Sequence, residues 1–170
     1  MGALALLSGK RAGARDVLLV DVNHKRLETA RRLGADETVH CGSPEEVAEA
    51  QRLAGRGFDL VIDASGSAPA RQLAFDLCCP GGQVALLGMG SQCSEVNFVA
   101  SIRKEHRVVM SFAYTPVDFR RSLSLLLAGE VDLTDWTEQM PLEQGQQALD
   151  KMSHAPGITL KMLLQVATAT

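Results

Sequence analysis

The chain has 170 residues, a length that suits one domain of ordinary size or a domain with a short appendage. Hydrophobic residues make up 46% and charged residues 22%, which is typical of a folded chain and argues against disorder. The net charge of −3 excludes the basic footprint of a nucleic-acid-binding protein. Because only 4% of the residues are aromatic, the core must be aliphatic, which favours buried parallel strands covered by helices.

Neither a membrane span nor a signal peptide is indicated. No run approaches the ~20 apolar residues that a spanning helix needs, and the first residues lack the positive charge and the apolar length of a signal peptide. The cysteines form no Cys-x-x-Cys pair, so we expect free thiols in a reducing cytoplasm. They are Cys41, Cys78, Cys79 and Cys93.

Strand-like apolar runs recur along the first two thirds of the chain. Their starts are about 20 to 25 residues apart, which is the spacing of successive β-α units. The runs are Val17–Val20, Glu37–His40, Phe58–Ile62, Val84–Leu87 and Arg107–Met110.

Helix signals lie between these runs. Ser43 and Thr115 each begin a capping box with proline at the first helical position. The alternation of strands and helices predicts an α/β fold with a doubly wound parallel sheet, because parallel neighbours need crossover connections. Further helices are expected over Ala3–Ala12, from Asn23 to Gly34, and from Ala70 to Leu77, where Pro80-Gly81-Gly82 ends the last one.

The pattern weakens after Gly129. A helix over Gln144–Met152 and a strand over Ile158–Leu164 predict a C-terminal helix and strand return segment. The tail Val166–Thr170 is expected to be frayed.

Asp21, at the end of the apolar run that begins at Val17, carries the most informative local signal. A carboxylate at the end of the second strand of a nucleotide-binding sheet accepts hydrogen bonds from both ribose hydroxyls of an adenosine. Its charge also repels a 2′-phosphate, which favours NAD over NADP. The alternative is an acidic residue that only caps the following turn.

The glycine fingerprint expected before such a carboxylate is incomplete. Gly88-Met89-Gly90 has Cys93 where a third glycine should stand, and no helix is predicted after it. Gly2 instead opens an Ala/Leu-rich helix that leads into the Asp21 strand. The beginning of the chain therefore has the pattern of a strand–glycine turn–helix–strand unit without its first half.

These features, with several longer stretches, resemble the C-terminal, cofactor-binding half of the zinc-type medium-chain alcohol and polyol dehydrogenases. The resemblance covers nearly the whole chain and implies a Rossmann-like sheet that lacks its first strand. The matching stretches are Gly13-Ala14-Arg15, Val20-Asp21, Arg26-Leu27-Glu28, Leu33-Gly34-Ala35-Asp36, Asp59 to Gly66, Pro80-Gly81-Gly82 with Leu87-Gly88, Pro141-Leu142-Glu143, and Gly157–Leu164.

The resemblance implies cofactor-binding residues but no catalytic residue and no metal ligand in this chain. Asp21 would hold the adenosine ribose with Arg26 beside it, and Gly2 would lie near the pyrophosphate. The remaining implied contacts are Ser65 and Gly66 in the cofactor cleft, Leu87 and Gly88 beside the nicotinamide, and Ser111 and Phe112 at its carboxamide end.

Three of these residues have a structural alternative. Gly88 would then only permit a tight exit from a strand, Ser65 would cap a helix, and Arg26 would be a solvated helix charge.

The chain departs from the family pattern in what it does not contain. The domain that carries the catalytic zinc ligands and the proton relay is missing, and the histidines do not fall at metal-ligand spacing with the cysteines. In the family, zinc lowers the pKa of the alcohol so that hydride can pass to the nicotinamide. We therefore expect zinc only in an absent domain and no activity from these 170 residues alone.

The missing first strand would be central in the strand order 3-2-1-4-5-6. Its absence would leave a gap of ~10 Å between the Asp21 strand and the Phe58 strand, or force these strands together. Each buried, unpaired backbone group is unfavourable by ~1–3 kcal/mol, so we expect the chain to be a piece of a longer polypeptide. Residues 1–113 would be a partial dinucleotide-binding domain, and residues 114–170 would pack on the absent catalytic domain.

The sequence thus predicts the NAD-binding portion of an oxidoreductase that transfers hydride between a small alcohol or polyol and NAD. The alternatives are a non-catalytic nucleotide-sensing or oligomerisation module, the zinc-free quinone reductase branch of the same superfamily, and, less favoured, a methyltransferase that uses S-adenosylmethionine. Ser94–Ala100 is expected to form an edge strand, and the resemblance implies that two copies pair through such an edge. Its alternative is a solvated loop with Phe98 tucked underneath.

Overall fold

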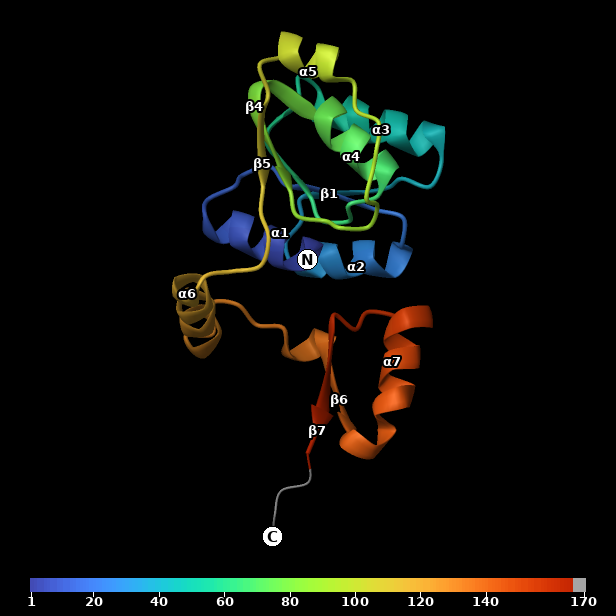
Figure 1. Ribbon diagram of the computed structural model, residues 1–170, viewed down its shortest axis with the longest axis vertical. Helices are drawn as coiled ribbons and strands as arrows, with labels where there is room; N and C mark the ends of the chain where they lie inside the picture. The colour runs from blue at the N-terminus through green and yellow to red at the C-terminus, as the bar shows by residue number, and fades with distance from the viewer. Residues whose placement is uncertain (167–170) are drawn as a thin grey trace. The chain divides into compact units, whose positions relative to one another are not determined.

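The computed structural model describes residues 1–166 (Figure 1). The chain divides into two compact units, Met1–Ala113 and a second that begins at Tyr114. No helix among residues 1–166 has the length and apolar character needed to cross a membrane. Of the tail expected to be frayed, residues 167–170 lie outside the described part of the chain.

The first unit alternates helices and strands as the sequence predicts. The observed bounds agree with the expected elements to within a few residues, except at β4 and at α5, which was not expected. The elements are α1 (Gly2–Arg11), β1 (Leu18–Asp21), α2 (His24–Arg32), β2 (Glu37–His40), α3 (Pro44–Ala54), β3 (Phe58–Asp63), α4 (Ala68–Asp76), β4 (Cys78–Leu86), α5 (Phe98–Arg103) and β5 (Arg107–Met110).

The strands of this unit form two separate parallel sheets, β1-β2 and β3-β4-β5, which are not hydrogen-bonded to each other. The main-chain groups of successive strand residues point to opposite sides. Asp21 O accepts from Cys41 N in β1–β2, and Asp63 O accepts from Leu87 N in β3–β4. The main-chain N–H and C=O groups of the alternate residues therefore point away from the paired strand. These residues are Leu18 and Val20, which point away from β2, and Leu60 and Ile62, which point away from β4. This is the break expected for a sheet without its central strand.

Side-chain packing joins the two sheets. One buried cluster is built on Val39, Ala50 and Leu77. Leu18 and Val20 of β1 and Phe58 and Val61 of β3 pack against it. Figure 1 shows α3 and α4 lying together beside the strands. Ala50 belongs to α3, and Leu77 directly follows α4. The unit is therefore continuous through its hydrophobic core although its backbone ladder is interrupted.

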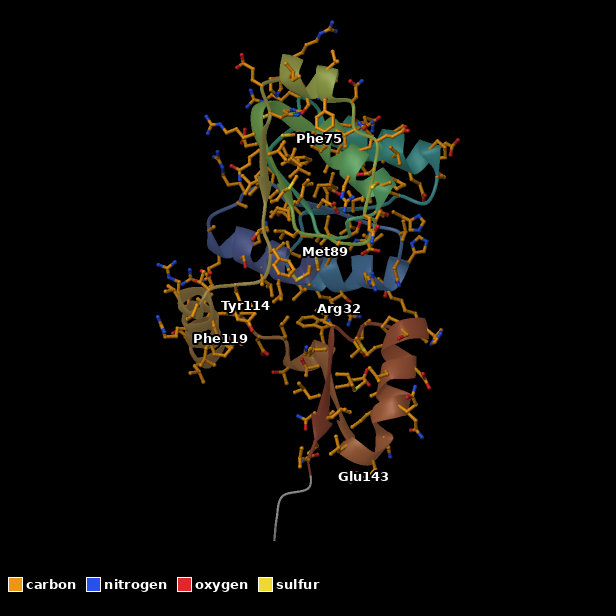
Figure 2. The ribbon with its side chains drawn as sticks, in the orientation of Figure 1. Arg32, Phe75, Met89, Tyr114, Phe119 and Glu143 are labelled. Atoms are coloured by element: carbon orange, nitrogen blue, oxygen red, sulfur yellow. The ribbon has the colours of Figure 1, made fainter. Side chains whose placement is uncertain are left out.

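A second cluster supports the three-stranded sheet. It contains Ala74 and Phe75 of α4 with Cys78 and Val84 of β4, and Val84 has no exposed surface. Phe75 points inward from α4 (Figure 2). This packing fixes α4, and with it the loop that connects β3 to α4.

The predicted helix starts are confirmed by their hydrogen bonds. Ser43 Oγ accepts from the Glu46 amide while the Glu46 carboxylate accepts from the Ser43 amide, so the capping box is complete. Thr115 and Asp118 form the same arrangement. Asn23 caps α2 through its side-chain oxygen.

The expected role of Pro80-Gly81-Gly82 as a helix stop is wrong. α4 ends at Asp76, and these residues lie within β4, which begins at Cys78. The register of β3 and β4 shifts between Phe58 and Leu60, and Gly81 has a φ of +74°. Such an irregularity accommodates proline in a strand that would otherwise need its amide hydrogen.

The expected edge strand over Ser94–Ala100 is also wrong. This segment is irregular as far as Asn97, whose side-chain oxygen caps α5 by accepting from Ala100 N, 3.0 Å away. The place beside β4 is taken by β5. Phe98 is 63% exposed, so the alternative of a loop with a tucked phenylalanine is wrong as well.

The second unit contains a small parallel sheet, β6-β7. The predicted return helix and strand are present, but β6 was not expected, because Thr137–Pro141 is short and polar. Glu138 of β6 accepts hydrogen bonds from both Lys151 of α7 and Thr159. The elements are α6 (Pro116–Leu127), η1 (Thr134–Trp136), β6 (Thr137–Pro141), η2 (Leu142–Gln144), α7 (Gly145–His154) and β7 (Lys161–Gln165).

Aromatic packing lies at the start of the second unit. The rings of Tyr114 and Phe119 lie 6.0 Å apart (Figure 2).

The break between β1 and β3 predicts a pattern of amide exchange. In the 170-residue chain, the amides of Val20 and Ile62 should exchange faster than those of Leu19 and Val61, because only the latter pair face a hydrogen-bonded strand. Hydrogen–deuterium exchange followed by NMR measures this difference. If Val20 were as protected as Leu19, and Ile62 as protected as Val61, the absence of a hydrogen-bonded strand between β1 and β3 would be contradicted.

Candidate functional site

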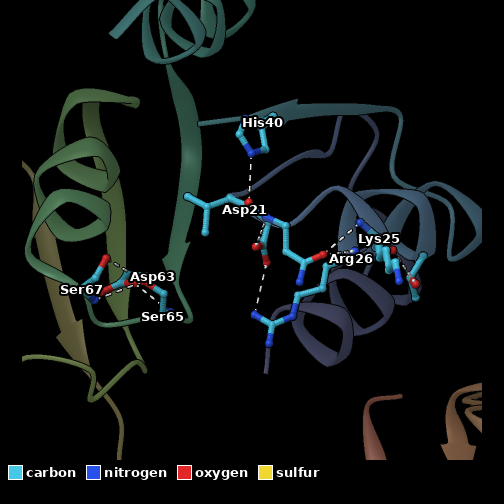
Figure 3. Close-up of polar contacts among 10 residues, drawn as sticks. Asp21, Lys25, Arg26, His40, Asp63, Ser65 and Ser67 are labelled. Carbon is cyan, nitrogen blue, oxygen red and sulfur yellow. Dashed lines mark hydrogen bonds and ion pairs between the residues drawn. The ribbon is translucent and has the colours of Figure 1, made fainter. Parts of the chain in front are cut away.

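The candidate site lies at the carboxyl ends of the strands of the first unit. In open α/β sheets ligands bind outside these ends. Figure 3 shows Asp21 and Arg26 on one side of this region and Asp63, Ser65 and Ser67 on the other. Gly2, at the start of α1, lies near the end of β3, since a Cβ on Gly2 would be 4.0 Å from Ala64 Cβ.

Asp63 organises the loop that follows β3. Its side chain is 1% exposed, and Oδ1 accepts hydrogen bonds from Ser65 N at 3.0 Å and Gly66 N at 2.8 Å. The Asp63 carbonyl accepts from both Leu87 N and Gly88 N at 2.9 Å. One residue therefore holds the main chain of both loops in which the sequence places cofactor contacts.

Arg71 of α4 links Asp63 to the loop after β4. Its Nε lies 3.7 Å from Asp63 Oδ2, and the guanidinium donates to Gly88 O at 3.3 Å and to Ser94 Oγ at 3.2 Å. Sequence reasoning missed both partners. Asp63 carried a usable signal, an acidic residue at the end of an apolar strand, as Asp21 does. Arg71 carried none, because its contacts lie in a distant loop.

Gly66 and Gly88 pack backbone against backbone. Gly66 has a φ of +72°, and a Cβ there would lie 2.2 Å from Gly88 C. A Cβ on Gly88 would lie 2.0 Å from Gly66 N. Both positions therefore require glycine for close approach, which is more than the tight strand exit considered for Gly88.

Ser65 is not the cap of α4. Ser67 holds that position and accepts from Ala70 N, while Ser65 Oγ accepts from Ser67 N at 3.2 Å. The Ser65 side chain thus stabilises the turn between β3 and α4. The alternative that Ser65 caps the helix is therefore wrong, because Ser67 caps it.

The two carboxylate oxygens of Asp21 have different surroundings. Oδ1 accepts from Asn23 N at 2.9 Å, so the carboxylate does cap the following turn. Oδ2 lies 3.9 Å from the Arg26 guanidinium, and the side chain is 24% exposed. Oδ2 can therefore accept further hydrogen bonds. Arg26 is 53% exposed and flanks Asp21 as expected.

The residues predicted after β4 and β5 are only partly brought together. Leu87 and Gly88 are half-buried, Gly88 lies against Gly66, and Ser111 N donates to Leu86 O at 3.2 Å. Phe112 is 81% exposed. Ser111 is thus held near the end of β4, whereas Phe112 extends from it.

The start of α1 suits an anion. No side chain caps this helix, and its first turn carries no acidic residue, so its first amide groups are available beside the loop after β3. The residues present therefore fit a dinucleotide, with the uncapped α1 for phosphate and Asp21 for a sugar. They do not fit a metal, because no three His, Cys, Asp or Glu side chains group suitably among residues 1–166.

The chain is similar to known dehydrogenases. Residues 1–128 match a family model described as zinc-binding dehydrogenase. A D-xylulose reductase of Saccharomyces cerevisiae is 30% identical over 96% of this chain. An L-threonine 3-dehydrogenase of Rhizobium johnstonii is 38% identical over 58% of this chain and 29% of that protein. The chain spans 49% of the D-xylulose reductase, about half its length.

Solved structures show the same fold. A short chain alcohol dehydrogenase from Escherichia coli, complexed with NADH, has a TM-score of 0.86 at 22% identity. The match covers 96% of this chain and 48% of the dehydrogenase chain. A benzyl alcohol dehydrogenase from Acinetobacter calcoaceticus has a TM-score of 0.85 at 22% identity over 98% and 47%. The predicted Rossmann-like α/β fold is thereby confirmed.

The contact between Gly66 and Gly88 predicts an unequal response to alanine. Gly66→Ala should lower the free energy of unfolding by roughly 1–3 kcal/mol more than Gly81→Ala, because it adds a backbone clash. Gly81 is the matched control, since its φ is +74° and a Cβ there would meet no atom within 4 Å. Urea denaturation measures both variants. Equal losses would contradict the close backbone contact.

The role of Asp63 predicts that its charge stabilises both loops. Asp63→Asn keeps an acceptor for Ser65 and Gly66 but removes the charge opposite Arg71. The free energy of unfolding should fall by roughly 1–3 kcal/mol. Asp59→Asn, at an exposed position of the same strand, should change it by less than about 0.5 kcal/mol. Equal urea denaturation midpoints for the two variants would refute this role.

Proposed function

Because the chain belongs to the zinc-binding dehydrogenase family, we propose that it forms the NAD-binding portion of an oxidoreductase that transfers hydride between an alcohol or polyol and NAD. The observation that carries this proposal is the Asp21 carboxylate at the end of β1, with one oxygen fixed by Asn23 and the other exposed. A carboxylate fixed in this way is ready to accept from ribose hydroxyls.

The other residues of the site would each hold a different part of the cofactor. The amide groups at the start of α1, beginning at Gly2, would bind the pyrophosphate. Ser65 and Gly66 would border the cleft, and Leu87 and Gly88 would lie beside the nicotinamide. Ser111 and Phe112 would meet the carboxamide end. NAD, when bound, supplies the carbon that accepts or returns hydride.

The rigidity of these loops is what the chain contributes to hydride transfer. Asp63 and Arg71 hold the loops after β3 and β4, which lie against each other at Gly66 and Gly88. A nicotinamide placed on these loops is oriented by main chain that does not need to reorganise, which lowers the entropy lost on reaching the reactive geometry.

Activation of the alcohol is not assigned to these residues. Residues 1–166 offer no cluster suited to zinc. The chemistry on the substrate oxygen would come from outside this chain, so the 170 residues alone should be inactive. The four cysteines are unpaired, and the protein would belong in a reducing cytoplasm.

The proposal predicts that NADH binds more tightly than NADPH, because Asp21 repels a 2′-phosphate. Isothermal titration calorimetry on the full chain measures both affinities. Asp21→Asn should weaken NADH binding roughly 10- to 100-fold, the loss expected for a charged hydrogen bond of ~1.5–3 kcal/mol. It should also reduce the preference for NADH.

A matched control is Asp16→Asn, which removes an exposed carboxylate just before the same strand. It should leave both affinities unchanged. Equal affinities of the unaltered chain for NADH and NADPH would refute the charge argument.

A further inference from the structure

His40 lies directly beside the proposed sugar-binding carboxylate. It ends β2 and is paired in register with Asp21 of β1. Its Nδ1 is 2.7 Å from Glu46 Oε1, and its Nε2 is 2.9 Å from Val22 O. Figure 3 shows the ring directed at the backbone next to Asp21. The imidazole thus bridges the turn after β1 and the first turn of α3.

Both partners of this ring are hydrogen-bond acceptors. The Val22 carbonyl can only accept, and a carboxylate can only accept. Glu46 is ionised, because its other oxygen accepts from Gly42 N at 2.8 Å and Ser43 N at 2.9 Å, and the bond from His40 lowers the pKa of Glu46. A neutral imidazole has a single N–H and satisfies one partner, whereas the imidazolium satisfies both.

The surrounding charges favour the same protonation state. The hydrogen bond to Glu46 raises the pKa of His40 most, and the Val22 carbonyl and the charges of Glu46 and Asp21 add to it, against some desolvation. His24 of α2 stacks on the ring, with centroids 4.0 Å apart and planes 10° from parallel. Glu37 of β2 and Glu49 and Arg52 of α3 line the same surface, and the latter two pair with each other at 2.6 Å.

We propose that His40 is a positioning residue of the nucleotide site, which as an imidazolium ties the turn behind Asp21 to α3 and places a positive charge beside it. The inference rests on the proposed binding of NAD. Val22 is 67% exposed, so this bond is what anchors its carbonyl to the body of the unit. A turn already held in place loses less conformational freedom when the ribose binds. The cation also favours a cofactor that carries net negative charge.

The sign of the pH effect follows from the direction of the pKa. A histidine whose pKa is raised in the folded chain keeps its bridge complete below the ordinary value of about 6.5. The bridge is lost as the pH rises through the raised pKa of the folded state. NADH affinity should therefore fall over that interval above pH ~6.5.

The test measures NADH affinity between about pH 6 and 9 in the full chain and in three variants. In the unaltered chain the dissociation constant should rise roughly fivefold or more across this range, the size of a typical coupling between sites. His40→Gln should bind more weakly at the acid end of the range and lose this pH dependence. Glu46→Gln should also flatten it, while keeping a capping box, because glutamine serves at that position.

The matched control is His24→Gln, which removes the neighbouring imidazole and should leave the pH dependence in place. If His40→Gln keeps the pH dependence of the unaltered chain, or if His24→Gln abolishes it, the proposal is overturned.

A second readout does not depend on the cofactor. Imidazole ¹⁵N NMR of the ligand-free chain should show two N–H groups on His40 at about pH 6.5 and a titration midpoint raised above the ordinary histidine value, and saturating NADH should raise that midpoint further. A single N–H on His40 at that pH overturns the proposal. Failure of NADH to bind at any pH overturns the proposed function and the coupling together. Binding that is independent of pH overturns only the role of His40.

Discussion

The buried carboxylate of Asp63 is the constraint on which half of the proposed nucleotide site depends. Its side chain holds Ser65 and Gly66, while its carbonyl holds Leu87 and Gly88. Asp63 Oδ2 has no hydrogen-bond partner among residues 1–166, and Arg71, 3.7 Å away, is the charge that compensates it. The close approach of the two loops at Gly66 and Gly88 is thus stabilised by the buried ion pair of Asp63 and Arg71.

The other half of the site stands on a different sheet. Asp21 belongs to β1, and no ladder hydrogen bond joins β1-β2 to β3-β4-β5. The relative position of the two halves is set by the shared cluster around Val39 and Ala50 and by α1, which starts beside Ala64. Hydrophobic packing is less directional than a backbone ladder. Binding of one dinucleotide across both sheets would therefore couple parts that the backbone leaves separate.

Local sequence signals predicted what depends on neighbouring residues. The capping boxes at Ser43 and Thr115 and the turn at Asp21 involve contacts within three residues, and all are present. What sequence reasoning missed depends on distant partners. Gly81 lies within β4 because its amide bonds Lys104 O and its strand pairs with β3, and Arg71 reaches Ser94. The strand expected over Ser94–Ala100 rested on the family resemblance, but Asn97 begins a helix there and β5 takes the place beside β4.

The charges around Asp21 show how one carboxylate can serve both structure and recognition. Arg26 at 3.9 Å and the bridge from His40 to the Val22 carbonyl flank it from two elements, so its turn stays in place without a partner that covers the carboxylate completely. A carboxylate held in a bidentate salt bridge would have fewer lone pairs free for a sugar, and one without cations nearby would repel the pyrophosphate of the cofactor more strongly. The intermediate arrangement keeps Oδ2 available, which is the condition that ribose binding requires.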